Sequence, residues 1–185
     1  MFAPSNPYSA SKAAAEMICH AYEKSFKMPL IIMRCNNAIS PFQHPEKLIP
    51  CCIHTLMTRK QTGQLLRIPI HGQGQSRRTF IHAKDIAGAI DTIVEKGELG
   101  KVYNIGTGEH MERSVYDIAS MLIQRIFGNE ANPEFYLEYV PDRAFQDYRY
   151  CIDSSALRAL GWTDTVSLED AIDDVIAYYQ KKNDK

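Results

Sequence analysis

The chain has 185 residues, of which 45% are hydrophobic and 23% are charged, and its formal net charge is −1. This composition suits one globular domain with a sizeable core. The near-neutral charge gives no basis for electrostatic capture of nucleic acid or of an anionic membrane, and no apolar run approaches the roughly 20 residues of a membrane span. We therefore expect neither nucleic acid nor a membrane as a partner.

The cysteines and histidines argue against a disulfide framework and against a metal centre. The five cysteines are odd in number, form no C-x-x-C pair and lie in apolar segments. The six histidines are scattered without the spacing of metal ligands. Because no signal peptide is visible after Met1, we expect core thiols in a reducing compartment, and hence a cytoplasmic protein without a metal site.

The first predicted element is a helix from Pro7 to about Phe26, because Asn6 is a good N-cap and proline suits the first helical position. Tyr8 and Lys12 are four residues apart, so their side chains share one face. An ammonium beside a phenol favours the phenolate, which makes them a candidate acid–base pair, although such pairs also arise by chance on many helices. The helix carries an apolar stripe, which is formed by Ala10, Ala14, Met17, Ile18, Ala21 and Tyr22. The small residues Ala13 to Ala15 suit close packing against another helix and packing in the core equally well.

A buried strand is predicted from Leu30 to Cys35, since a short and almost continuously apolar run after a helix suits a parallel strand covered on both faces. Ligands of open α/β sheets lie beyond the carboxyl ends of strands, which makes the polar Asn37 a candidate contact. The next helix is predicted from about Leu48 to Arg59. Lys47, just before it, is a candidate phosphate contact, and a solvated surface lysine is the alternative.

Strands and helices alternate through the rest of the chain. Pro69 marks the strand over residues 68–72 as an edge or terminal strand. Asp85 is predicted to cap a helix from about residue 86 to residue 97, with Ile86, Ile90, Ile93 and Val94 on its apolar face. The remaining predictions are a strand over 101–105, a helix capped by Ser114 and ending near Arg125, a strand over 135–140, a short helix over 153–160 that ends at Gly161, and a last helix capped by Ser167.

Six motifs occur in an order that resembles the extended short-chain dehydrogenase/reductase family. They are Y-S-A-S-K-A-A-A-E at 8–16, P-E-K-L-I-P at 45–50, R-R-T-F-I-H-A-K-D at 77–85, Y-N-I-G-T-G at 103–108, P-D-R-A-F-Q-D-Y-R-Y at 141–150 and L-G-W at 160–162. Together they look most like a nucleotide-sugar 4,6-dehydratase of the dTDP-glucose or UDP-glucose type, and they cover essentially the whole chain. The P-E-K-L-I-P and D-R-x-x-x-D-x-R-Y segments are specific, whereas the Y-x-x-x-K pair alone is not.

The resemblance implies an α/β fold: the C-terminal part of a doubly wound Rossmann-like sheet plus a small α/β substrate-binding subdomain. Residues 1–44 would form the end of the Rossmann core, including the Y-x-x-x-K helix. Residues 45–185 would form mostly the nucleotide-sugar-binding subdomain, with some segments returning to the core. The cofactor would be NAD and the substrate dTDP-glucose or UDP-glucose. In the complete enzyme the first helix would contribute to a homodimer interface.

The resemblance also implies roles for particular residues. Tyr8, helped by Lys12, would take the 4-hydroxyl proton of the sugar while hydride passes to NAD; water would then leave across C5–C6, and hydride would return to C6. Tyr8, Lys12 and Ala38 would contact the cofactor. Arg78 would grip the diphosphate, a task that its planar guanidinium suits. The full set of substrate contacts would be Asn37, Lys47, Leu48, Pro69, His71, Arg78, Arg143 and Asp147.

The sequence departs from the pattern of the resembled family in two respects. The family usually carries N-x-Y-G-P, whereas this chain has Asn37-Ala38-Ile39-Ser40-Pro41, which loses a glycine and an aromatic hydroxyl. The sequence also contains no G-x-G-x-x-G, since Gly106-Thr107-Gly108 lacks the third glycine, and the Asp-Glu pair that dehydratases use is absent.

We therefore expect a C-terminal fragment that does not turn over substrate unaided and whose strand over 30–35 has an unpaired edge. Two alternatives stay open: a UDP-sugar epimerase or decarboxylase of the same family, and a non-catalytic module that binds nucleotide sugars or dimerises with a full-length enzyme.

Overall fold

The computed structural model describes residues 3–143, 145 and 147–183, except for the side chain of Asn183. Its helices are α1 (Pro7–Phe26), α2 (Leu48–Thr62), α3 (Ala83–Lys96), α4 (Val115–Phe127), α5 (Ser155–Arg158) and α6 (Leu168–Asn183), with 3₁₀ turns η1 (Glu109–Met111) and η2 (Pro133–Phe135). Its strands are β1 (Ile32–Cys35), β2 (Asn37–Ile39), β3 (Ile68–His71), β4 (Arg77–His82), β5 (Val102–Ile105), β6 (Glu112–Ser114), β7 (Leu137–Val140) and β8 (Arg149–Tyr150). Among the described residues, no helix combines the length and the apolar character that a membrane crossing requires.

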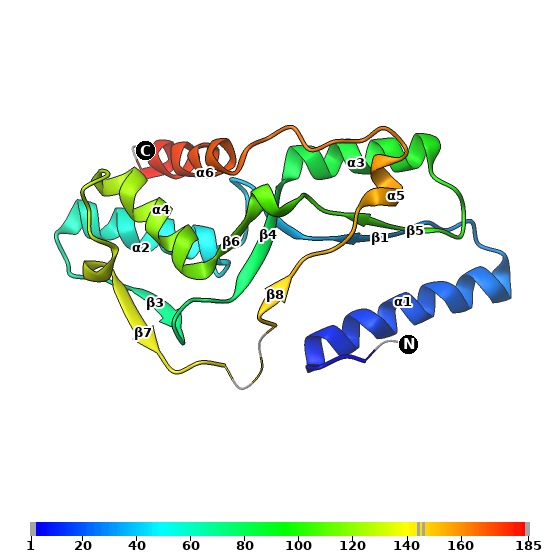
Figure 1. Cartoon of the computed structure of the whole chain (residues 1–185), viewed down its shortest axis with the longest axis horizontal. Helices are drawn as coiled ribbons and strands as arrows, with labels where there is room; N and C mark the ends of the chain where they lie inside the picture. The colour runs from blue at the N-terminus through cyan, green and yellow to red at the C-terminus, as the bar shows by residue number, and fades with distance from the viewer. Residues whose placement is uncertain (1–2, 144, 146, 184–185) are drawn as a thin grey trace.

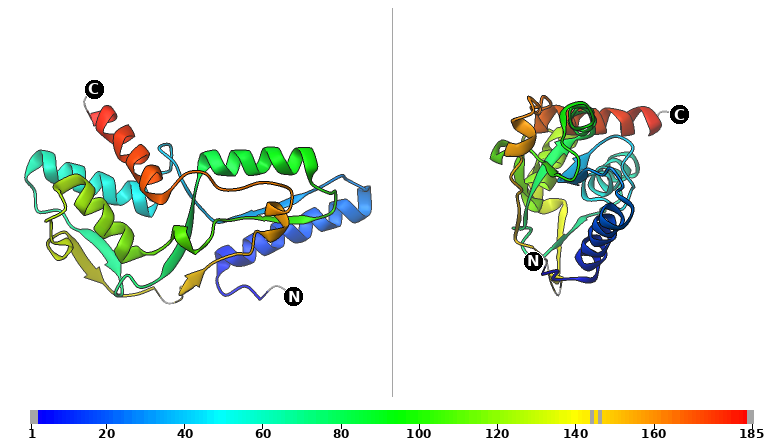
Figure 2. Two further views of the ribbon diagram at one scale, coloured as in Figure 1. Left: turned by 45° about the horizontal axis from the view of Figure 1, so that its top comes forward. Right: turned by 90° about the vertical axis from the view of Figure 1, so that its right-hand side faces the viewer.

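The molecule is elongated and has two lobes joined by β4 (Figures 1 and 2). One lobe contains α2, α4 and α6 with the parallel pair β3–β7. The other contains the parallel pair β1–β5, with α3 on one side of it and α1 on the other. Each lobe has its own apolar core, and the chain passes between them several times. Ile39 and Phe80 belong to the first core, whereas Ile81, Ile93 and Trp162 belong to the second.

Strand β4 lies in the middle of a four-stranded central sheet, in which it pairs with β2, β6 and β8. Its first half pairs antiparallel with β6 and parallel with β8, and its second half pairs parallel with β2. The register places Arg77 opposite both Ser114 and Arg149, and Asn37 opposite Phe80. Segments from four distant parts of the sequence therefore meet at one strand.

Local sequence signals set the helix ends. The predicted bounds of the first helix are confirmed, and Asn6 forms a capping box in which its side chain accepts a hydrogen bond from the Ser9 backbone N–H. Ser114 caps α4 through the N–H of Asp117, and Ser167 caps α6 through the N–H of Asp170, as predicted. These caps depend on residues three positions apart, which is why the sequence reveals them.

The prediction that Asp85 caps its helix is wrong. His82 is the N-cap of α3, and its Nδ1 accepts a hydrogen bond from the Lys84 backbone N–H. Asp85 is buried in the first turn, where its carboxylate accepts three hydrogen bonds from Thr165 and Val166. It therefore fastens α3 to the segment that precedes α6. The predicted apolar face of this helix is also partly wrong, because Ile90 and Val94 are exposed.

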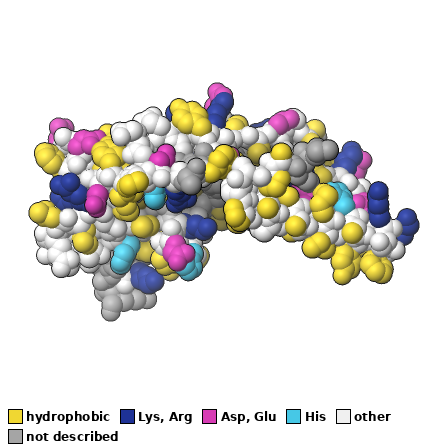
Figure 3. All heavy atoms as spheres, turned by 90° about the horizontal axis from the view of Figure 1, so that it is seen from below, with side chains coloured by type: hydrophobic (Ala, Val, Ile, Leu, Met, Phe, Trp, Pro, Cys, Tyr) yellow, Lys and Arg dark blue, Asp and Glu magenta, His cyan; other side chains and the backbone are white. Residues whose placement is uncertain are grey.

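Core packing, one of the two explanations left open for the small residues of α1, is not observed, and the predicted burial of strand β1 is wrong. No residue of α1 is buried, and the hydrophobic side chains of this helix are visible on the right-hand arm of Figure 3. The helix reaches β1 through a charged pair between Glu16 and Arg34, whose hydrogen bonds lower the pKa of the Glu16 carboxyl. Strand β1 pairs with β5 and is mostly exposed, so it is not covered on both faces.

The predicted core thiols are confirmed at Cys52 alone. Cys52 lies in α2 and is buried, so desolvation raises the pKa of its thiol to about 12. Cys35 and Cys151 are exposed, because the first ends the open strand β1 and the second follows the short strand β8. Cys19 and Cys51 are partly buried.

Candidate functional site

A cavity of about 470 Å³ lies where α2, β2, β3 and β4 meet the segment that joins β7 to β8. The predicted substrate contacts that line it are Asn37, Lys47, Leu48, Pro69, His71, Arg78 and Arg143. Glu46, Cys51, Cys52, Ile68, Ser76, Phe80 and Val115 complete the lining. The fold thus brings together residues that are up to about a hundred positions apart in the sequence.

The secondary structure explains why these side chains meet. Asn37 begins β2 and is paired with Phe80 of β4. Lys47 is the residue before α2, and Leu48 begins that helix. Pro69 and His71 lie on β3, and His71 Nδ1 is 3.1 Å from the carbonyl oxygen of Pro141. Polar groups are therefore placed at the ends of several elements around one apolar wall.

Arg78 of β4 is held in place by hydrogen bonds to two backbone carbonyls. Its Nη1 donates hydrogen bonds to the carbonyl oxygens of Arg77 at 2.7 Å and Asp147 at 2.8 Å. Partial burial lowers the pKa of its guanidinium, the negative charge of Asp147 opposes this shift, and the positive charge of Arg143 adds to it. An anion placed between the two arginines would favour the charged form of Arg78.

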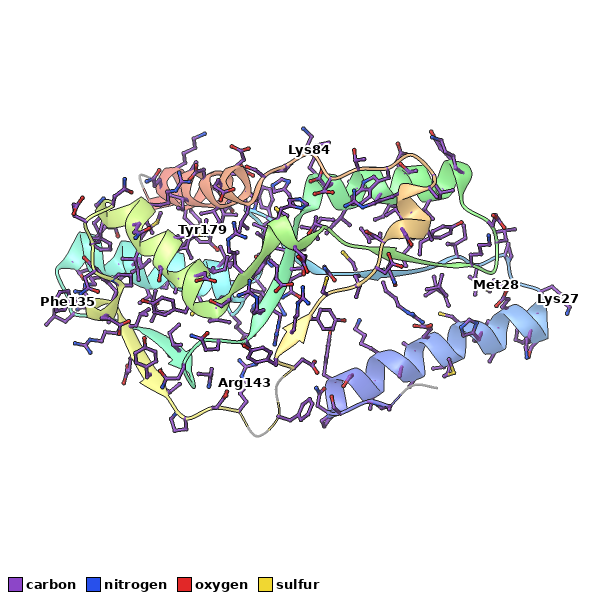
Figure 4. All side chains as sticks on the ribbon, in the orientation of Figure 1. Lys27, Met28, Lys84, Phe135, Arg143 and Tyr179 are labelled. Carbon is purple, nitrogen blue, oxygen red and sulfur yellow. The ribbon has the colours of Figure 1, made fainter. Side chains whose placement is uncertain are left out.

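The charge of the cavity is predominantly positive. Among the described lining residues, Lys47, Arg78 and Arg143 occur with a single carboxylate, that of Glu46. Arg143, labelled in Figure 4, lies on the segment between β7 and β8. Two planar guanidinium groups and an ammonium around an open space with apolar walls suit a phosphate-bearing ligand with an organic body.

Asp147, which the resemblance implies to be a substrate contact, has another role in the structure. It is not among the described residues that line the cavity, and its backbone carbonyl holds the guanidinium of Arg78. In the structure it therefore orients a cavity residue.

Sequence reasoning missed several lining residues. Cys51 lies one helical turn after Lys47, so helical periodicity could have placed it on the same face. Ser76 directly precedes the Arg77-Arg78 pair and is buried. Val115, the first residue of α4, lines the cavity because the fold brings α4 to it, and no local sequence pattern reveals this.

Tyr8 and Lys12 lie on α1, outside the set of described residues that line the cavity. Lys12 Nζ is 5.9 Å from the centroid of the Tyr8 ring, and Tyr8 is 72% exposed. The pair therefore shares one face, as the spacing predicts, and its polar atoms are accessible. Ala38 follows Asn37 in β2, and its carbonyl accepts a 2.6 Å hydrogen bond from the Gln43 side chain. This bond closes the loop in which the N-x-Y-G-P pattern is altered, and Ile39 fills the adjacent core.

The described residues contain no group of three or more histidine, cysteine, aspartate or glutamate side chains that could hold a metal ion.

The comparison with protein families places the chain in a known family. The model of the GDP-mannose 4,6-dehydratase family matches residues 1–175, and the chain belongs to this family. The predicted family resemblance and the predicted α/β fold class are confirmed.

Individual relatives agree with this assignment. The chain is 39% identical over 180 residues to the dTDP-D-glucose 4,6-dehydratase of Mus musculus, a match that covers 96% of this chain and 48% of the mouse protein. It is 40% identical over 176 residues to a trifunctional enzyme of Arabidopsis thaliana with UDP-glucose 4,6-dehydratase activity, over 95% of this chain and 25% of that protein. The crystal structure of dTDP-glucose 4,6-dehydratase from Streptomyces venezuelae with NAD and TYD bound superposes with a TM-score of 0.86 at 29% identity, over 100% of this chain and 54% of that one. The chain thus spans about half the length of the mouse and Streptomyces proteins and 25% of the Arabidopsis protein.

Proposed function

We propose that this chain is the nucleotide-sugar-binding part of an NAD-dependent nucleotide-sugar 4,6-dehydratase that acts on dTDP-glucose or UDP-glucose. The observation that carries the proposal is the cavity, in which Lys47, Arg78 and Arg143 surround a space with apolar walls. Family membership and the names of the relatives support the same activity. Residues 1–44 would belong to the Rossmann core and residues 45–185 mostly to the substrate-binding subdomain.

The lining residues divide into three roles. Arg78, Arg143 and Lys47 would hold the diphosphate through charge-assisted hydrogen bonds. Leu48, Pro69 and His71 would contact the nucleoside, because they supply the apolar and flat surfaces of the wall. Asn37 would hydrogen-bond the sugar or the phosphate next to it, and Asp147 would act by fixing Arg78.

The residues of α1 and β2 would form the part of the NAD site that this chain supplies. Lys12 and Tyr8 fit a ribose and a reacting hydroxyl because they share one face and Tyr8 is accessible. Bound NAD would supply hydride transfer, and Tyr8 would take the proton from the 4-hydroxyl of the sugar while Lys12 stabilises its phenolate. Ala38 would lie beside the cofactor. A Gly-rich pyrophosphate loop is absent from the 185 residues.

We further propose a cytoplasmic homodimer for the complete enzyme. The exposed apolar side chains of α1, which include Met17, Ile18 and Tyr22, support an interface on this helix.

Calorimetric titration of the chain with dTDP-glucose and UDP-glucose tests the proposal. We expect one of the two to bind one-to-one, and Arg78→Met to weaken that binding by about 10- to 100-fold, which is the effect of losing a charge-assisted hydrogen bond. Arg125→Met is the matched control, because Arg125 is an exposed arginine paired with Asp173 outside the described cavity lining. Failure of both nucleotide sugars to bind a folded chain would refute the proposal.

A turnover assay tests the catalytic side separately. We expect the 185-residue chain alone to release no 4-keto-6-deoxy sugar nucleotide, because its sequence lacks the glycine loop and the Asp-Glu pair. Product formation by the purified chain would contradict this part of the account.

A further inference from the structure

Glu112 of β6 is a buried carboxylate whose two oxygens are held by two different arginines. Its side chain is 4% exposed. Its Oε1 accepts a hydrogen bond from Arg77 Nε at 2.5 Å, and its Oε2 accepts one from Arg149 Nε at 2.9 Å. Since Arg77 lies on β4 and Arg149 on β8, one carboxylate joins three strands of the central sheet (Figure 1).

This bridge and the cavity lie on opposite faces of β4. Successive side chains of a strand point to opposite faces, so Arg77 shares a face with Thr79, and Arg78 points to the other. The register places Glu112 opposite Thr79 and Arg149 opposite Arg77, which explains why these side chains meet. Arg78 lines the cavity from the second face, and Glu112 is not among the described lining residues.

Strand β8 is short. It comprises Arg149 and Tyr150, and it pairs with β4 over two residues. Two hydrogen bonds flank this pairing, one from the Arg77 backbone N–H to the Tyr148 carbonyl at 2.7 Å and one from the Thr79 hydroxyl to the Tyr150 carbonyl at 3.2 Å. Arg149 also donates from Nη2 to Glu109 at 2.8 Å. Charged side-chain contacts therefore add to the backbone pairing that holds β8 against β4.

The position of β8 bears on one cation of the cavity. The carbonyl of Asp147, two residues before the strand, accepts the hydrogen bond from Arg78. A shift of β8 would therefore release the guanidinium of Arg78.

We propose that Glu112 is a positioning residue for diphosphate recognition: by holding β8 against β4 from the far face of the sheet, it keeps the Asp147 carbonyl in place and thereby orients the guanidinium of Arg78. This inference rests on the proposed function, because it takes the cavity to bind a nucleoside diphosphate. It assigns to a residue outside the cavity a part in the preference for a diphosphate over a monophosphate.

The test compares a nucleoside diphosphate with its monophosphate. The probes are UDP and UMP, or dTDP and dTMP if the wild-type chain binds those more tightly, and dissociation constants are measured by titration calorimetry. We expect Glu112→Gln to reduce the preference for the diphosphate by about tenfold, since one charge-assisted contact is lost, while monophosphate binding changes little. Asp173→Asn, the same change in an exposed pair with Arg125, should leave the preference unaltered. A general loss of packing would instead weaken both ligands equally.

A second variant covers the case in which Glu112→Gln fails to fold. Arg149→Leu leaves Glu112 paired with Arg77 but releases β8, and we expect the same loss of preference. If either variant, when folded, retains the wild-type preference, the inference is wrong while the proposed function stands. If neither variant shows a cooperative unfolding transition, Glu112 maintains the fold and the inference is also wrong. If the wild-type chain binds no nucleoside diphosphate, both the proposed function and the inference are wrong.

Discussion

Arg78 on β4 donates a hydrogen bond of 2.8 Å from its Nη1 to the backbone carbonyl of Asp147, which lies 69 positions further along the chain. The two residues belong to the R-R-T-F-I-H-A-K-D and P-D-R-A-F-Q-D-Y-R-Y motifs, whose order identified the family. Their contact shows how the two motifs act together: one supplies a cation to the cavity, and the other holds that cation in place.

The cavity predicts selective protection of one thiol by a bound nucleotide. Cys51 lines the cavity and is partly buried, so we expect N-ethylmaleimide to modify it, and a saturating nucleoside diphosphate to slow that reaction by about tenfold or more. Cys52 is next to it but should stay unmodified, because burial raises the pKa of its thiol to about 12. Peptide mass spectrometry measures both residues in one sample.

Cys151 provides the internal control for this experiment. It is exposed and is not among the described residues that line the cavity, so its modification rate should not depend on the nucleotide. Equal protection of Cys51 and Cys151 would indicate a global effect of the ligand, and no protection of Cys51 would place the nucleotide elsewhere.

Asp85 should be important for stability. Its Oδ1 accepts hydrogen bonds from the Thr165 backbone N–H and hydroxyl, and its Oδ2 accepts one from the Val166 N–H. In Asp85→Asn the new NH₂ group faces a donor, so we expect the free energy of unfolding in urea to fall by about 2 to 4 kcal/mol. Asp91→Asn, on an exposed position of the same helix, should change it by less than about 0.5 kcal/mol. Equal effects of the two variants would show that the buried contacts of Asp85 contribute nothing.

Gly74 should tolerate a side chain less well than Gly63, although both have positive φ. A methyl group at Gly74 (φ +67°) would lie 2.9 Å from the Ile70 side chain and 3.2 Å from the backbone nitrogen of Tyr116, whereas one at Gly63 (φ +73°) meets nothing within 4 Å. We expect Gly63→Ala to cost about 1 kcal/mol of unfolding free energy from backbone strain, and Gly74→Ala about 3 kcal/mol from strain plus overpacking. A Gly74→Ala chain as stable as Gly63→Ala would contradict the close approach of β3 and α4 seen here.

Acid should weaken the fold partly through Glu112. The hydrogen bond from Arg77, followed by that from Arg149, holds the pKa of its carboxyl below the ordinary value of 4.5. A pKa that is lower in the folded state contributes stability above the unfolded value, and this contribution disappears as the pH falls through the folded one. We therefore expect the free energy of unfolding to decrease below about pH 4.5, and to decrease less steeply in Glu112→Gln. Urea denaturation of both chains across this range measures the difference, and identical slopes would exclude a role for Glu112.

Contacts that are local in sequence were predictable, and contacts between distant strands were not. The N-caps Asn6, Ser114 and Ser167 each bond a residue three positions ahead, so the pattern of residue types was enough to place them. Asp85 had the same local appearance, but its partners lie 80 positions away and changed its role. The Glu112 bridge depends on which strands flank β4, a fact that no spacing reveals.

The main residues of the cavity were predictable from motifs, because a family resemblance implies which residues, distant in sequence, lie together in the fold. Lys47, Arg78 and Arg143 were chosen from three separate motifs, and the structure brings them to one cavity. The apolar stripe of α1 shows the limit of periodicity, since Met17 and Ile18 lie on a regular helical face and are nevertheless exposed. The helical spacing of apolar residues shows that one face of a helix is apolar, but it does not show what covers that face.

The most direct test of the central claim is a crystal structure of the chain with UDP or dTDP. We predict electron density for the diphosphate in the cavity, within hydrogen-bonding distance of Arg78 and Arg143, with the nucleoside toward Leu48, Pro69 and His71. Density for the nucleotide at any other surface of a well-ordered chain, with the cavity empty, would contradict the proposal that this cavity recognises nucleotide sugars.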